Sequence, residues 1–227
     1  MNLRAFQAAL DERVTRHDLL SHPFYQAWAE GKLSIDQLRA YASEYFHHVA
    51  AVPTFLSAFH SRLADGALRR AVLSNLAEEE VEGRAHSDMW LDFAEGIGLS
   101  PERVRNGQPS APVRNLIARF DRTAREDSPA DVLAAFYAYE SQVPRISGEG
   151  ARGLLRHYGA DSSTCGYFVL HTYADIRHSQ IWQEQLGRVV ARDRKLADSA
   201  LAAAERAAGW LWQALDGSTA NRLCAAA

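Results

Sequence analysis

Apolar residues recur along most of the chain at spacings of three and four, which is the period of an α-helix. No stretch alternates as a β-strand would, and no linker is long enough to divide the chain. The pattern predicts an all-α bundle of seven or eight helices over residues 1–217, followed by a disordered tail over 218–227. Long helices are expected over about residues 2–17, 34–64, 67–95, 112–125, 129–146, 162–188 and 192–215, and short ones at Phe24–Trp28 and after Ser100.

Polar and glycine-rich segments separate these helices. Ser34 and Gln37 form a capping-box pattern at the start of the longest predicted helix. Asp65-Gly66 is typical of a turn, and the segments GIG (96–98) and NGQPSAP (106–112) are typical helix breakers.

Composition points to one domain with a sizeable core, because 47% of the 227 residues are hydrophobic. The 25 basic and 28 acidic residues leave a formal charge of −3 without a basic block, so nucleic acid and anionic membranes are not expected partners. No apolar run reaches the about 18 residues of a membrane span, and the N-terminus is too charged for a signal peptide. The two cysteines, Cys165 and Cys224, do not suggest a disulfide framework, and we expect a cytoplasmic protein.

The segment HTYADIRH (171–178) places three polar side chains on one helix face. At about 100° per residue, Asp175 lies about 40° from His171, and His178 lies about 20° away on the other side. Phe168 and Trp182 share this face, so we expect it to point inward. Three buried polar groups need partners or a metal ion.

Two further segments repeat this feature. In LAEEEVEGRAH, Glu79 and His86 are seven residues apart, which returns to the same helix face, whereas Glu78 and the other glutamates fit that face less well. In VLAAFYAYESQVPR, Glu140 is the only charge between Asp131 and Arg145, so we expect it to be buried.

Together these segments supply three carboxylates and three imidazoles. Mixed oxygen and nitrogen ligands of this number suit two divalent first-row metal ions, with iron or manganese favoured over thiolate-seeking ions. The predicted metal ligands are Glu79, His86, Glu140, His171, Asp175 and His178.

Each segment alone also allows a structural interpretation. Glu79 and His86 could lie on a solvated face, and Glu140 could pair with Arg145 or Arg152. HTYADIRH could form a polar stripe or a structural zinc site. A competing metal site would use Glu44 and His47, the ExxH pair of ferritin-like di-iron bundles, but it lacks a second ExxH.

The six residues and several longer segments resemble the haem-oxygenase-like di-iron oxidases. Within that family the similarity is greatest to the branch of the chlamydial protein associating with death domains, and it is weaker to pyrroloquinoline quinone synthase. The segments that carry the resemblance are HPFYQAW (22–28), LRAYASEYFHH (38–48), YESQVPRI (139–146) and ADIRHS (174–179).

This resemblance implies a seven-helix bundle, a metal pair that activates dioxygen, and a role in forming p-aminobenzoate for folate. In such relatives the aromatic ring is thought to come from a tyrosine of the protein itself, and Tyr25 matches that residue. Tyr41 and Tyr167 match other active-site tyrosines. Without the resemblance, Tyr25 is equally well interpreted as a core aromatic residue beside Phe24 and Trp28.

One position departs from the pattern of this family. Its aminobenzoate-forming members carry a lysine after the PRI motif, which is proposed to supply the amine, but Gly150 occupies that position here. The resemblance therefore leaves two alternatives open: another amine donor, or an external small-molecule substrate.

Two other classes of function remain. One is a metal-free enzyme of the same fold, resembling pyrroloquinoline quinone synthase or a thiaminase with Cys165 as nucleophile, although Cys165 lies about 120° from the metal face. The other is a helical interaction or metal-storage protein. For the oxidase we expect a small-molecule or self-derived substrate and an external reductant, and a homodimer is an open option.

Overall fold

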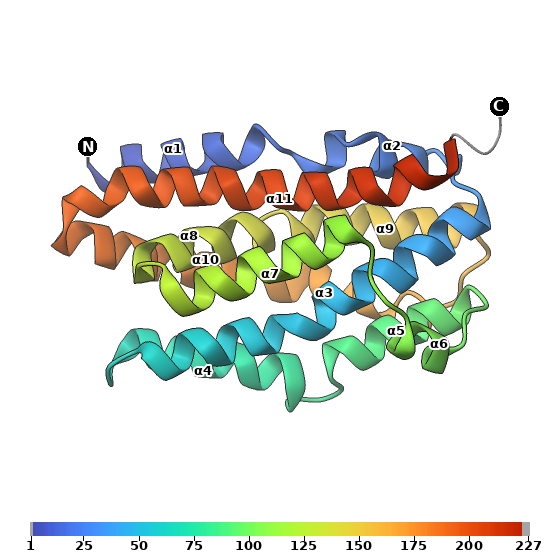
Figure 1. The fold of residues 1–227 in the computed structure, drawn as a ribbon, viewed down its shortest axis with the longest axis horizontal. Coiled ribbons are helices and arrows are strands. Elements are labelled where there is room, and N and C mark those ends of the chain that lie inside the picture. Colours follow the sequence, from blue (N-terminus) through green and yellow to red (C-terminus); the bar gives the residue numbers. More distant parts are fainter. Residues whose placement is uncertain (1, 224–227) are drawn as a thin grey trace.

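Helices running close to the long axis of the molecule make up the computed structural model (Figure 1), which describes residues 2–223 and their side chains through residue 216. No strand occurs in residues 2–223, so the predicted all-α fold is confirmed. The helices are α1 (Leu3–Thr15), η1 (Leu19–Ser21), α2 (Pro23–Ala29), α3 (Ile35–Arg62), α4 (Ala67–Glu80), α5 (His86–Gly96), α6 (Pro101–Asn106), α7 (Ala111–Glu126), α8 (Pro129–Glu140), α9 (Val143–His157), α10 (Gly166–Arg192), η2 (Arg194–Leu196) and α11 (Ala197–Leu223).

The sequence signals at several helix ends are confirmed. Ser34 and Gln37 form the predicted capping box, in which the Gln37 amide donates to the Ser34 hydroxyl over 3.2 Å and the Ser34 amide donates to the Gln37 side chain over 2.7 Å. Gly66 precedes α4 with φ +151°, a conformation that favours glycine.

The predicted helix over 67–95 is wrong, because residues 81–85 interrupt it between α4 and α5. Gly83 in this segment has φ +85°, which a right-handed helix cannot contain. The predicted helix over 129–146 is also broken, at Ser141 and Gln142. Pro144 lies in the first turn of α9, where proline lacks only an amide that has no helical partner.

The end of the chain differs in part from the expectation. Helix α11 runs to Leu223, beyond the boundary expected after residue 217. Residues 224–227 of the expected disordered tail lie outside the described residues, so the division into domain and tail stays a prediction.

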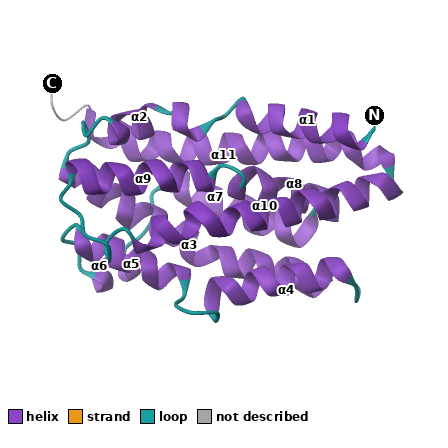
Figure 2. Cartoon of the chain, turned by 180° about the vertical axis from the view of Figure 1, so that it is seen from behind, coloured by secondary structure: helices purple, strands orange, loops and turns teal. Residues whose placement is uncertain are grey.

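Helix α8 lies inside the bundle, between α10 and α11, as the views from both sides show (Figures 1 and 2). All but two of its residues are buried. It packs against α11, and both helices carry several buried alanines, whose small side chains permit close packing. A charged side chain on α8 therefore has to find partners within the core. None of the described helices combines the length and the apolar character needed to cross a bilayer.

Candidate metal centre

The polar stripe of α10 points into the core, as predicted. His171, Asp175 and His178 are each at most 4% exposed, whereas Tyr173 and Ile176 on the opposite face of the helix are exposed. The helical period therefore separates a site face from a solvent face on the same element.

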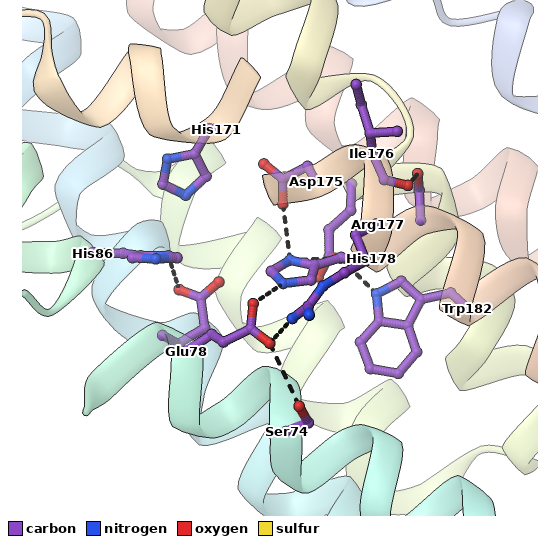
Figure 3. Close-up of polar contacts among 12 residues, drawn as sticks. Ser74, Glu78, His86, His171, Asp175, Ile176, Arg177, His178 and Trp182 are labelled. Atoms are coloured by element: carbon purple, nitrogen blue, oxygen red, sulfur yellow. Dashed lines mark hydrogen bonds and ion pairs between the residues drawn. The ribbon is translucent and has the colours of Figure 1, made fainter. Parts of the chain in front are cut away.

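The six predicted residues come together in two groups at the centre of the bundle. One group contains Glu79, His86 and His171, and the other contains Glu140, Asp175 and His178. Within each group one ligand-type atom from each residue lies within 4.8 Å of the others. Figure 3 shows His171, Asp175 and His178 projecting from α10 toward the other residues of the site.

Glu79 and His86 meet for a reason other than the predicted one. They do not share a helix: Glu79 lies at the end of α4, and His86 is the first residue of α5. The turn at 81–85 folds the two helices so that His86 Nδ1 lies 2.8 Å from Glu79 Oε2. The positive φ of Gly83 makes this turn possible, and a glycine within a charged run was the signal for it.

Glu140, at the end of α8, does not pair with an arginine. Its Oε2 accepts a hydrogen bond of 2.6 Å from Trp182 Nε1 and lies 3.7 Å from His178 Nδ1. Arg145 pairs instead with Asp18, and Arg152 pairs with Glu149. The arginine interpretation of Glu140 is therefore wrong.

The pKa values of the ionisable groups in the site shift in different directions. Burial, together with the nearby carboxylates Asp175 and Glu79, raises the pKa of Glu140 well above its usual value, although His178 opposes this. Burial alone would raise the pKa of Glu79 too, but the hydrogen bond and charge of His86 lower it. Burial would lower the pKa of His178, but hydrogen bonding to Asp175 and the charges of Glu140 and Asp175 raise it to about 10.

Two atoms in the site are suited to a cation. Asp175 Oδ2 is buried and has no hydrogen-bond partner. The Tyr167 backbone carbonyl can only accept, so its 2.7 Å contact makes His171 Nδ1 the donor and leaves Nε2 with a free lone pair. A buried carboxylate oxygen without a partner costs free energy unless an ion or water contacts it, so this donor set fits divalent metal ions.

The three predicted tyrosines line one small cavity beside this site. The hydroxyls of Tyr25 and Tyr41 are 2.9 Å apart, and the ring of Tyr167 stacks on His171 with 3.9 Å between ring centroids. Tyr45 and Tyr139, which the sequence did not single out, line the same cavity. Their positions in the sequence could have indicated this, since Tyr45 lies one helical turn after Tyr41 and Tyr139 directly precedes Glu140.

Glu78 is a further residue that the sequence set aside. Its Oε2 lies 2.8 Å from Nε2 of His178, on the side of the ring that faces away from Asp175 (Figure 3). The packing of α4 against α10 brings this glutamate to His178, and no spacing along the chain indicates that contact.

The alternative sites do not form among the described residues. Neither Glu44 nor His47 belongs to a group of three ligand-type side chains there, and Glu44 instead accepts the Ser110 amide over 2.6 Å. Burial raises the pKa of the Cys165 thiol, which is unfavourable for a nucleophile.

The chain is similar to known proteins of one enzyme family. The sequence model of the family described as iron-containing redox enzymes, in the haem-oxygenase group, matches residues 39–211. The 4-aminobenzoate synthase of Chlamydia pneumoniae is 37% identical over 206 residues, which cover 91% of each chain.

This chain belongs to the iron-containing redox enzymes. Among such relatives, the pyrroloquinoline-quinone synthase of Ruegeria pomeroyi is 33% identical over 156 residues, covering 67% of this chain and 64% of that protein. A solved haem-oxygenase-like domain from Shewanella denitrificans superposes with a TM-score of 0.80 at 19% identity, covering 100% of this chain and 96% of that one. The haem-oxygenase-like fold of this iron-containing redox enzyme is thereby confirmed.

Proposed function

We propose that this oxidoreductase is a non-haem oxidase with two divalent ions, iron or iron with manganese, and that it uses dioxygen to oxidise an aromatic ring. The observation that carries the proposal is the pair of buried ligand groups, which meet on one face of α10. Three carboxylates against two divalent ions leave about one positive charge, which is a small net charge for a buried site. The family and the partnerless Asp175 Oδ2 support the same assignment.

Neighbouring groups orient the residues that would hold the ions. Trp182 fixes Glu140 by its indole N–H, His86 fixes Glu79, and the backbone of Tyr167 fixes His171. Iron or manganese would supply one-electron and dioxygen chemistry that side chains lack, and the electrons would come from an external reductant. Buried aromatic rings, such as that of Tyr167, lie against the site and would limit the access of water.

We infer that the substrate is a tyrosine of the chain itself. The cavity among the tyrosines is about 20 Å³, which is room for about one water molecule and too little for an external aromatic ring. This small volume favours a reacting ring that is already inside, and Tyr25 is our candidate because similar proteins are named 4-aminobenzoate synthases. Tyr41 would orient its hydroxyl, and Tyr167 would serve as relay between the metal site and the tyrosines.

The amine for such a product would come from outside position 150. A Cβ atom added at Gly150 would lie 2.8 Å from Cδ1 of Phe168, so the buried Phe168 ring occupies the path of any side chain there. Arg152 is a poor donor because its guanidinium stays protonated. We propose that ammonia or another residue supplies the nitrogen.

Mass spectrometry on reduced, metal-loaded protein tests this function. With oxygen and labelled ammonium, wild type should consume oxygen and release labelled aminobenzoate, and Tyr25→Phe should not release it. Tyr173→Phe is the control, because Tyr173 is exposed on the outer face of α10.

Three results would change the proposal. Equal product from Tyr25→Phe and wild type would favour an external small-molecule substrate. Unlabelled product in the presence of labelled ammonium would exclude ammonia and leave another residue as the amine donor. Wild type that binds no metal would favour a metal-free enzyme similar to pyrroloquinoline-quinone synthase.

A further inference from the structure

Glu78 and Glu79 are adjacent in sequence but contact different imidazoles. Successive residues on a helix point about 100° apart, so the two carboxylates cannot occupy one position. Glu79 contacts His86, whereas Glu78 Oε2 lies 2.8 Å from Nε2 of His178 on α10 (Figure 3). Glu78 thus contacts the group of Glu140, Asp175 and His178 without belonging to it.

The imidazole of His178 lies between Glu78 and the carboxylates of its own group. Its Nδ1 is 3.3 Å from Asp175 Oδ1 and 3.7 Å from Glu140 Oε2, while its Nε2 faces Glu78. A carboxylate can only accept from Nε2–H. In the neutral form of the ring, the tautomer that satisfies Glu78 therefore has its lone pair on Nδ1. That lone pair faces the two carboxylates with which an ion would be shared.

Glu78 is itself held in place from two helices. Arg177 of α10 donates to Glu78 Oε1, and the Ser74 hydroxyl of α4 lies 3.5 Å from the same oxygen. The Glu78 side chain is 18% exposed, against 60% for Arg177, so the carboxylate lies between the closed site and the surface. With both oxygens engaged, its orientation toward His178 is fixed.

We infer that Glu78 is a positioning residue for the group of Glu140, Asp175 and His178. By accepting the Nε2 proton of His178, it selects the tautomer and the ring orientation that present Nδ1 to a metal ion. Such outer carboxylates change metal affinity by about 10- to 100-fold. The inference rests on the proposed function, because it requires an ion at this group.

Isothermal titration calorimetry tests the inference. Chelator-treated protein is titrated anaerobically with Fe(II), which gives the number of ions bound and the affinity for each. A parallel titration with Co(II) reports the ligand geometry by visible absorption. Wild type should bind two ions. Glu78→Leu, which removes the acceptor, should bind one of them about 10- to 100-fold more weakly and change the Co(II) spectrum of that ion alone. Glu78→Gln keeps an oxygen acceptor, so its affinity for that ion should lie between those of wild type and Glu78→Leu.

Glu80→Gln is the matched control, because Glu80 ends the same helix but is exposed, and it should behave as wild type. Wild-type affinity for both ions in Glu78→Leu would overturn the inference and leave the proposed function intact. Equal weakening of both ions with a lower melting temperature of the metal-free protein would mark a general structural role and overturn it too. Complete loss of one ion from both Glu78 variants would make Glu78 a direct ligand instead. A wild type that binds no ion would refute the proposed function itself.

Discussion

His48 is a fully buried histidine without a hydrogen-bond partner on either ring nitrogen. Its ring contacts the rings of Tyr45, Phe55, Phe120 and Tyr139. Burial lowers its pKa to about 3, so the folded protein keeps this imidazole neutral at pH values where the unfolded chain protonates it.

Replacing His48 with Phe should reduce the fall of the unfolding free energy as the pH is lowered. The folded pKa lies below the unfolded value, so the contribution of His48 is fully present above about pH 6.5 and declines as the pH falls toward 3. Between pH 6.5 and 5, wild type should lose about 2 kcal/mol more of its unfolding free energy than His48→Phe. Urea unfolding at several pH values measures this, and parallel profiles for the two proteins would show that His48 titrates normally in the fold.

Individual residues of the site were predictable where the helical period decides their direction. His171, Asp175 and His178 follow from spacing on one helix, and Glu140 follows from being the lone charge on a buried segment. Glu78 could not be predicted in this way, because its contact depends on how α4 lies against α10. Periodicity describes one helix at a time and carries no information about the angle between two.

At the scale of elements, α9 shows how packing overrides helix propensity. The sequence between Ser147 and Gly153 contains three glycines and was not predicted to be helical, yet α9 continues through it to His157. A Cβ atom at Gly153 would lie 2.4 Å from Trp28 Cδ1, and one at Gly150 would lie 2.8 Å from Phe168 Cδ1. These glycines therefore allow aromatic rings of neighbouring helices to approach the backbone, a reason that only the tertiary structure reveals.

Alanine substitutions at two glycines of α9 should have opposite effects. Gly150→Ala should lower the unfolding free energy by about 1–3 kcal/mol, because the buried ring of Phe168 has to move. Gly148→Ala should raise it by about 0.5–1 kcal/mol, because no atom lies within 4 Å of the added Cβ and alanine favours a helix. Urea unfolding of both variants compares them, and equal effects would mean that Phe168 does not restrict position 150.

The breaks in the helices were only partly predictable. Pro144 is a recognised signal for a helix start, and its position explains why α8 ends at Glu140 and α9 begins at Val143. At 81–85 the surrounding residues are good helix formers, and an isolated glycine is often tolerated within a helix. The break there depends on the positive φ of Gly83, which the sequence permits without requiring.

At the scale of the whole molecule, the proposed ions would join four helices, since α4, α5, α8 and α10 each supply at least one ligand. An ion that binds only this arrangement stabilises it by mass action, by about 2.7 kcal/mol at one hundred times its dissociation constant. For a chain of this size we expect the melting temperature to rise by about 5–10 °C.

Differential scanning fluorimetry of metal-free protein with and without Fe(II) measures this shift. The Glu79→Ala, His86→Ala double variant removes two ligands of one group and should show a smaller shift than wild type. An unchanged melting temperature in excess metal would mean that the ions bind elsewhere or not at all.

The turn between α4 and α5 also contains a trypsin cleavage site whose accessibility should depend on metal binding. Arg84 lies in this turn with an exposed side chain, and residues of one ligand group, Glu79 and His86, stand on either side of it. Trypsin must draw several residues around a scissile bond into an extended strand, which requires the turn to separate from the bundle. An ion shared by Glu79 and His86 would tie down both ends of that strand, so cleavage after Arg84 should slow as the site fills. The rate of cleavage in this turn would therefore report how much of the metal site is filled. Gel electrophoresis of the fragments measures that rate without an assay of catalysis.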